Sequence, residues 1–254
     1  MRMILEKLLE GSISLDECEE MIRNRILKVA DFAKIDLNRE TRTGIPEVIL
    51  CSGKSDQQII DIASCMLEDN RKVILSRVPP PLMNSFTHLP CRIRKHPEAR
   101  LMVLSPKDYV DRITSEINSP TLAVVSAGTA DVTVATEAKV CAEELGCDVF
   151  TSFDVGVAGI HRLLPVIKRL HENRIKVVIV AAGREGALPS VIAGLIDGIV
   201  IGLPVSSGYG YGGEGKAALM GMLQSCTPLL VVNIDAGIIA GMMGAKIAKL
   251  MALR

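Results

Sequence analysis

Five short apolar runs recur along the carboxyl-terminal half of the chain, and each is followed by a glycine-containing turn and a helix-like segment. The runs are nearly continuous in Val, Ile and Leu, as in parallel strands that are covered on both faces. The segments between them supply right-handed crossover helices. The pattern predicts a doubly wound, three-layer α/β domain of the Rossmann or flavodoxin type, with strands at 121–126, 147–153, 176–182, 198–205 and 229–234 and helices that begin near Ala130, Gly159, Ala187, Gly213 and Ala236.

The amino-terminal part mixes helical and strand patterns. Ser14 and Glu17 have the spacing of a capping box, which predicts a helix through Met21, Ile22 and Ile26 to about residue 30. Other patterns predict strands at 47–51, 72–78, 92–95 and 100–104 and a helix at 55–67. The polar segment 107–120 precedes the long apolar strands and is typical of a boundary. We therefore expect a smaller α/β domain at residues 1–118 and a larger one at 119–254.

Composition excludes several classes of function. The net charge is +0, aromatic residues make up 3% and Trp is absent, so no basic nucleic-acid surface or stacking platform is indicated. Apolar runs are interrupted well before the roughly 20 residues of a membrane helix, and the first residues lack a secretory signal. We expect a cytoplasmic protein that acts on small molecules and binds neither nucleic acid nor membrane.

The seven Cys are scattered without a CxxC pair, which argues against a disulfide framework or a zinc site. The last predicted helix, at 237–248, is apolar and rich in small residues. Such a helix is covered either by a second subunit or by its own sheet. We expect a homo-oligomer, with an octamer as one option.

Four turns follow predicted strands, at 126–131, 183–190, 205–213 and 233–237. In an open parallel sheet these turns lie at one edge, where ligands bind. Glu185 lies in the second turn, and its carboxylate is a candidate proton acceptor. The alternative is a surface Glu paired with Arg184.

The turn at 126–131 leads into a helix, whose free amides attract anions, and Ser126 and Thr129 add hydroxyl groups. Asp131 is either part of the site or a first-turn acid that complements the helix dipole. Arg162 is a candidate for phosphate, although a solvated surface Arg is the commoner case.

The segment 208–216 satisfies two glycine templates, GxGxxG and GxxxxGK. Both signals are weak, because their overlap shows mainly that the turn is rich in glycine, and in the second template Ala217 stands where a phosphate loop has Ser or Thr. The segment still allows a close approach of backbone to a ligand, with Tyr209 and Tyr211 able to pack on a ring or sugar. A purely conformational turn is the alternative.

Several motifs in one order resemble the LarB family, the carboxylase/hydrolases of nickel-pincer-nucleotide cofactor biosynthesis. They lie at 126–131, 154–164, 183–190, 202–210, 224–228 and 233–237, and segments 42–48 and 53–55 are similar to the family's amino-terminal domain. The same half is more distantly similar to the phosphoribosylaminoimidazole carboxylase of purine synthesis (PurE), whose GSxSD, SAHR and AAHLPG stretches correspond loosely to 126–131, 158–162 and 185–190. That enzyme depends on the His before Leu-Pro, where this chain has Ala187.

The LarB resemblance implies carboxylation of C5 of the pyridinium ring of nicotinic acid adenine dinucleotide, or of a similar NAD-like dinucleotide, with carbon dioxide or bicarbonate. Hydrolysis of the phosphoanhydride would release AMP and leave pyridinium-3,5-biscarboxylate mononucleotide. The resemblance assigns the catalytic Cys and Glu to Cys226 and Glu185. It also implies Mg²⁺, for which Asp131, Asp154 and Asp235 are candidates. Substrate-binding candidates are Ser126, Gly128, Thr129, Asp131, Arg162, Gly183, Ser206, Ser207, Tyr209, Asn233 and Asp235.

Two other functions fit the same residues. A nucleotide-binding regulatory protein could keep the fold without the chemistry, and a purine carboxylase is opposed by Ala187. Without the resemblance, Cys226 would be interpreted as an inert buried thiol, which is the usual state of a lone Cys. The carboxylase mechanism requires that Cys226 and Glu185 face one cleft, within a subunit or across an interface.

Overall fold

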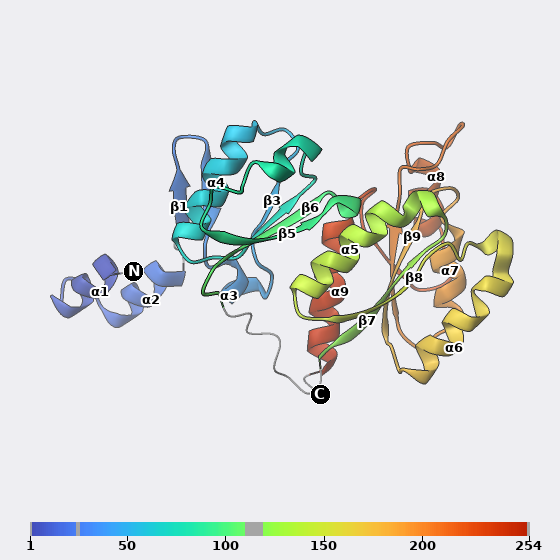
Figure 1. Cartoon of the computed structure of the whole chain (residues 1–254). Coiled ribbons are helices and arrows are strands. Elements are labelled where there is room, and N and C mark those ends of the chain that lie inside the picture. Colours follow the sequence, from blue (N-terminus) through green and yellow to red (C-terminus); the bar gives the residue numbers. More distant parts are fainter. Residues whose placement is uncertain (1, 24–25, 110–118, 253–254) are drawn as a thin grey trace. The chain divides into compact units, whose positions relative to one another are not determined.

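A computed structural model describes residues 2–23, 26–109 and 119–252. The chain divides into two compact units, one that holds the elements through β6 and one that holds those from β7 onward (Figure 1). The boundary expected between residues 118 and 119 adjoins the segment 110–118, which lies outside the described residues, so it stays a prediction.

The carboxyl-terminal unit contains the predicted parallel sheet. Its strands are β7 (Thr121–Ser126), β8 (Asp148–Ser152), β9 (Val177–Ala182), β10 (Ile199–Pro204) and β11 (Leu230–Val231). Their order is β11-β10-β9-β7-β8, and every neighbouring pair is parallel. Counted along the chain this is the order 2-1-3-4-5, the flavodoxin-like arrangement. The predicted fold class is therefore confirmed.

Helices cover both faces of this sheet (Figure 1). On one face α5 (Val132–Glu144) packs against α9 (Gly237–Ala252), and on the other α6 (Leu164–Glu172), α7 (Ala187–Ala193) and α8 (Lys216–Leu223) complete a buried core. Close packing in α9 depends on small residues, because a Cβ on Gly241 would lie 2.5 Å from the carbonyl oxygen of Ala138. The small-residue face of α9 is thus covered within its own unit. Among the described helices, none is long and apolar enough to cross a membrane.

The amino-terminal unit is a smaller mixed α/β structure, as predicted. β3 (Val48–Leu50), β4 (Val73–Ser76), β6 (Leu101–Pro106) and β5 (Cys91–His96) form a sheet in that order, parallel between β3 and β4 and antiparallel elsewhere. α4 (Asp56–Glu68) covers the sheet with Ile59, Ile62 and Met66, which share a core with Phe86. The shorter helices are α1 (Arg2–Leu9), α2 (Leu15–Arg23) and α3 (Arg39–Thr43).

The first predicted helix was only partly right. The Ser14–Glu17 capping box forms, with both reciprocal hydrogen bonds at 2.7 and 3.2 Å, but α2 ends at Arg23. Residues 26–29 are β1 (Ile26–Val29), which pairs antiparallel with β2 (Ala33–Asp36). An apolar period of two explains the hairpin, because Val29 and Ile35 are buried in the amino-terminal core while Lys28 pairs with Lys34 outside it.

The last strand is shorter than predicted. Regular pairing covers only Leu230–Val231, although the Asp235 amide still donates to the carbonyl of Pro204 at 2.9 Å. Asp235 has a φ of 54°, a left-handed conformation that turns the chain into α9. The chain thus stays hydrogen-bonded to β10 beyond β11 until it turns into α9.

Candidate functional site

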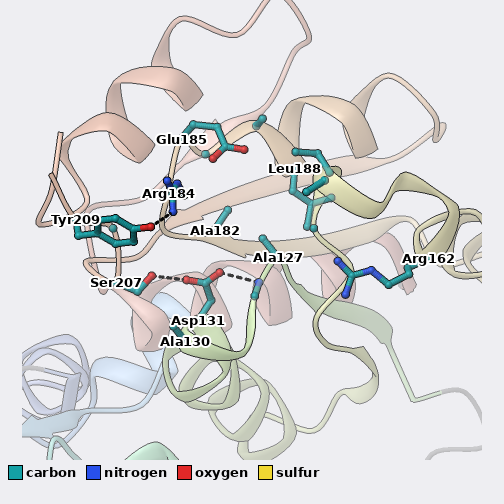
Figure 2. Close-up of a pocket in the computed structure, with 17 residues that line it drawn as sticks. Ala127, Ala130, Asp131, Arg162, Ala182, Arg184, Glu185, Leu188, Ser207 and Tyr209 are labelled. Atoms are coloured by element: carbon teal, nitrogen blue, oxygen red, sulfur yellow. Dashed lines mark hydrogen bonds between the residues drawn. The ribbon is translucent and has the colours of Figure 1, made fainter. Parts of the chain in front are cut away.

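The site lies where the strand order reverses. β8 lies on the far side of β7 and β10 on the far side of β9, so the connections after β7 and β9 diverge and leave a crevice at the carboxyl ends of these strands. A pocket of about 280 Å³ occupies this position (Figure 2). Its walls come from the turns that follow β7, β8, β9 and β10, and its lining residues are Ala127, Gly128, Ala130, Asp131, Gly156, Val157, Ala158, Arg162, Ala182, Arg184, Glu185, Gly186, Ala187, Leu188, Ser207, Gly208 and Tyr209.

Asp131 connects two walls of the pocket. It ends the 3-10 turn η3 (Thr129–Asp131) just before α5 and is 4% exposed. One carboxylate oxygen accepts the amide hydrogen of Gly128 at 2.9 Å, and the other accepts the hydroxyl hydrogen of Ser207 at 2.6 Å (Figure 2). Asp131 therefore braces its own turn and also holds the turn after β10 against it.

Two glycines allow the turn after β9 to fit into this site. A Cβ on Gly183 would lie 1.8 Å from Ser207 Oγ and 2.7 Å from Asp131 Oδ1, so a side chain there would displace the hydrogen bond between them. Gly186 has a φ of 69°, and a Cβ on it would lie 2.4 Å from the carbonyl oxygen of Ala218 in α8. Glu185 is presented between these two positions.

Glu185 lies in the pocket wall and is exposed. The alternative pairing with Arg184 does not form: Arg184 donates a hydrogen bond to the hydroxyl of Tyr209 and stacks on its ring, with Cζ 4.5 Å from the ring centroid (Figure 2). Among the described residues, nothing holds the Glu185 carboxylate in a hydrogen bond or ion pair. It is thus available to a ligand.

The rest of the pocket wall consists of apolar side chains and one positively charged side chain, that of Arg162. Ala127, Ala182 and the buried Leu188 provide a surface of methyl groups (Figure 2). Arg162 lies on the side of the pocket away from Tyr209 and pairs with Asp154 at 3.0 Å, with both side chains partly exposed. This arrangement suits a flat apolar ring with an anionic group at one end.

Several predicted site residues shape the turns without lining the pocket. Ser126 is completely buried, and its hydroxyl accepts the amide hydrogen of Asp154 at 3.2 Å and donates to the carbonyl of Gly128 at 3.3 Å. Thr129 is exposed beside the pocket. Gly183 contributes only the space that Ser207 occupies.

The turn at 233–237 also lies outside the pocket wall. The Asp235 carboxylate accepts the amide hydrogen of Ser206 at 2.9 Å, and the Asn233 side-chain oxygen accepts the amide hydrogen of Ile234 at 2.8 Å. These bonds brace neighbouring turns. Of the predicted substrate-binding residues, the structure thus brings together Gly128, Asp131, Arg162, Ser207 and Tyr209.

Cys226 is exposed but does not line this pocket. It lies in the turn between α8 and β11, ahead of a strand, whereas Glu185 follows one. The next residue, Thr227, is tethered by its hydroxyl to the carbonyl of Ser190 at 3.1 Å. One chain therefore does not place the two predicted catalytic residues in one pocket, and their pairing stays a prediction.

The three candidate Mg²⁺ ligands lie in separate turns and each accepts a hydrogen bond within the protein, so their role in metal binding stays a prediction. Among the described residues, no three His, Cys, Asp or Glu side chains gather as a metal site would require. Asp131, Asp154 and Asp235 instead accept hydrogen bonds from Ser207, Arg162 and Ser206.

Sequence reasoning missed Arg184 as a pocket residue and considered it only as a partner of Glu185. The sequence did indicate it, because Arg184 directly follows a predicted strand, at the edge of the sheet where ligands bind. The alanines of the wall gave no signal, since small apolar residues at strand ends look the same whether they face core or pocket.

Comparisons with known proteins cover both units. Residues 27–107 match the LarB/PurE-like N-terminal domain, and residues 121–253 match AIR carboxylase. The uncharacterized protein MJ0165 of Methanocaldococcus jannaschii is 38% identical over 253 residues, which covers 95% of this chain and 94% of that protein. The whole pocket lies within the second match. With the LarB-type domain preceding the carboxylase domain, the chain belongs to the AIR carboxylase (PurE) family of enzymes as a LarB-like member.

Proposed function

We propose that the chain carboxylates C5 of the pyridinium ring of nicotinic acid adenine dinucleotide and cleaves its phosphoanhydride to release AMP. The observation that carries the proposal is the pocket wall at 185–187, where Glu185 offers a carboxylate and Ala187 only a methyl group. The purine carboxylases place an imidazole before Leu-Pro. Because that imidazole is missing here, proton transfer falls to Glu185.

The pocket suits the nicotinate mononucleotide half of this substrate. The alanines and Leu188 can cover the faces of the ring, while the Gly128 backbone, Ser207 and Arg162 supply polar groups for ribose and phosphate. A volume of about 280 Å³ is too small to enclose the whole dinucleotide, so the adenylate half would extend beyond it.

The chemistry requires a nucleophile and a base. A pyridinium ring is electron-poor, so a thiolate first adds at C4 and converts the ring into an enamine whose β-carbon is C5. C5 then forms a bond to carbon dioxide, its proton passes to the Glu185 carboxylate, and expulsion of the thiolate restores the aromatic ring. One hydrogen of the ring is thereby replaced by one carboxylate, and the thiolate is regenerated.

Cys226 would enter the pocket from a second copy of the chain. Its turn is exposed, and the apolar neighbours Leu223 and Leu230 are 59% and 50% exposed, which is typical of a face covered by another subunit. A homo-oligomer that places this face over the pocket of a partner would unite the thiol with Glu185. The Mg²⁺ implied by the resemblance would enter with the pyrophosphate group of the dinucleotide and would neutralise its charge during cleavage of the phosphoanhydride.

Product analysis tests the proposal. The full chain is incubated with nicotinic acid adenine dinucleotide, ¹³C-bicarbonate and Mg²⁺, and the products are identified by mass spectrometry. We expect one labelled carboxylate on the mononucleotide and an equal amount of AMP. Glu185→Gln should form neither product, whereas Arg169→Gln, a change on the exposed side of α6, should behave as wild type.

Three results would contradict the proposal. Normal turnover by Glu185→Gln would exclude the assigned base. Tight binding of the dinucleotide without bicarbonate-dependent AMP release would favour a regulatory nucleotide-binding protein. Carboxylation of aminoimidazole ribonucleotide in place of the dinucleotide would favour the purine reaction.

A further inference from the structure

Arg184 is a pocket cation that contacts an aromatic side chain from another turn. It lies in the turn between β9 and α7, and Tyr209 reaches it from the turn after β10. The guanidinium lies over the Tyr209 ring and also donates a hydrogen bond to its hydroxyl (Figure 2). These two contacts favour the position in which the guanidinium faces the Tyr209 side chain.

In the described part of the chain, no acidic side chain pairs with Arg184. Among the described residues, its partner is Tyr209, and the adjacent Glu185 carboxylate does not bind it. Arg162, the other arginine of the pocket, is already paired with Asp154. A guanidinium has five N–H donors, so stacking and one bond to a phenol leave several for a ligand. Those donors match the two oxygens of a carboxylate.

We propose that Arg184, positioned by Tyr209, binds the carboxylate at C3 of the pyridinium ring and so selects nicotinate over nicotinamide substrates. This inference rests on the proposed function. Arg184 and Glu185 are consecutive in one turn, so a ring carboxylate held by Arg184 keeps the same ring beside the proposed base. Arg162 lies on the other side of the pocket, where it would contact the phosphate while it stays paired with Asp154 (Figure 2).

The selectivity has a simple physical cause. A carboxylate presents acceptors to the guanidinium on both oxygens, whereas a carboxamide presents one acceptor and one NH₂ group. In the amide, donor would face donor and the charge of Arg184 would lack a counter-charge. Sites that hydrogen-bond one substrate in this way reject the mismatched analogue strongly.

The test compares the acid substrate, nicotinic acid adenine dinucleotide, with the amide substrate, NAD. Both are assayed with wild type, Arg184→Gln and the control Arg169→Gln. We expect kcat/KM for nicotinic acid adenine dinucleotide to fall about 10- to 100-fold in Arg184→Gln, with little change for NAD. Calorimetric binding of nicotinic acid mononucleotide and nicotinamide mononucleotide gives a readout without turnover. The acid should bind more tightly to wild type, and Arg184→Gln should lose that preference.

Other anions would give different patterns. If Arg184→Gln lowers kcat/KM equally for nicotinic acid adenine dinucleotide and for NAD, Arg184 contacts a phosphate and the inference is overturned. A variant in which only the KM for bicarbonate rises would also overturn it. An undiminished acid preference in Arg184→Gln would overturn it directly. If wild type forms no carboxylated product, the proposed function fails, while the mononucleotide binding still decides whether Arg184 recognises a carboxylate.

Tyr209 variants separate positioning from simple charge. Tyr209→Phe keeps the stacking and removes the hydroxyl acceptor, so it should lose part of the acid preference. Tyr209→Ala removes both contacts, so its acid preference should fall nearly as low as that of Arg184→Gln. Full acid preference in Tyr209→Ala would show that Tyr209 does not position Arg184.

Discussion

The two acidic side chains of the pocket differ in the way that their proposed roles require. Asp131 is buried, and both of its carboxylate oxygens accept hydrogen bonds, which holds it in place and occupies it. Glu185 is exposed on the wall and, within the described part of the chain, unbonded. Asp131 is thus suited to holding the site together and Glu185 to moving a proton.

Thiol reactivity should single out Cys226. Burial raises the pKa of Cys51 and of Cys147 to about 11, so both remain protonated and unreactive near pH 8. Cys226 is exposed, and we expect iodoacetamide to label it first at this pH, as measured by peptide mass spectrometry. Labelling of Cys51 and Cys147 should appear only as the pH approaches 11 or after denaturation.

The labelling experiment can be repeated in the presence of substrate. If Cys226 attacks the ring, nicotinic acid adenine dinucleotide should slow its labelling but not that of the half-buried Cys65. Faster labelling of Cys51 than of Cys226 in the native protein would contradict the assignment.

Gly183→Ala should disable the site while keeping the fold. The added Cβ would overlap Ser207 Oγ at 1.8 Å and push Ser207 away from Asp131, so the two turns would separate. We expect at least a 10-fold loss of kcat/KM and a destabilisation of about 1–3 kcal/mol, measured by product assay and by urea unfolding. Gly194→Ala is the matched control, since its nearest contacts would be ordinary ones of 3.6 Å or more. Full activity in Gly183→Ala would show that the bond between Ser207 and Asp131 is dispensable.

At the scale of single elements, the turns that follow the strands contain the residues of the candidate site. Helix caps determine where the helices begin. In α4 the Ser55 hydroxyl accepts the Gln58 amide hydrogen at 3.3 Å, and the Gln58 side chain accepts the Ser55 amide hydrogen at 3.0 Å. This reciprocal pair satisfies two amides that a helix start leaves open. The sequence predicted the start of this helix at residue 55, and the structure confirms it.

Ser55→Ala should therefore weaken the amino-terminal unit. The expected loss is about 1 kcal/mol in the free energy of unfolding, measured by urea denaturation of the full chain. Ser52→Ala, at an exposed position in the preceding turn, serves as the control and should change stability by less. Equal losses in the two variants would mean that the cap does not stabilise α4.

At the scale of the whole molecule, subunit mixing can test whether one site uses two copies. Cys226→Ala and Glu185→Gln are each expected to be inactive. If Cys226 serves the pocket of a partner subunit, coexpression of the two variants creates mixed dimers with one intact site, and about a quarter of wild-type activity should return. No recovery in verified mixed oligomers would show that both residues act within one chain.

The sequence by itself determined the fold class of the carboxyl-terminal unit and the edge of its sheet where the candidate site lies. Five near-continuous apolar runs that alternate with glycine turns and helices are typical of a parallel sheet covered on both faces, and the carboxyl ends of parallel strands share one edge. The capping box at Ser14 also specified a helix start, because its hydrogen bonds involve residues only three apart.

Only the tertiary structure decided which side chains meet. The span 26–29 fits a helix or a strand by its short apolar pattern, and the amino-terminal core selected the strand by burying Val29. Asp131 and Ser207 are 76 residues apart, and Arg184 and Tyr209 are 25 apart, so no local pattern could pair them. The same holds for Cys226, which the fold keeps out of the pocket that Glu185 lines. Such contacts depend on how turns from different strands pack, which is a property of the assembled sheet.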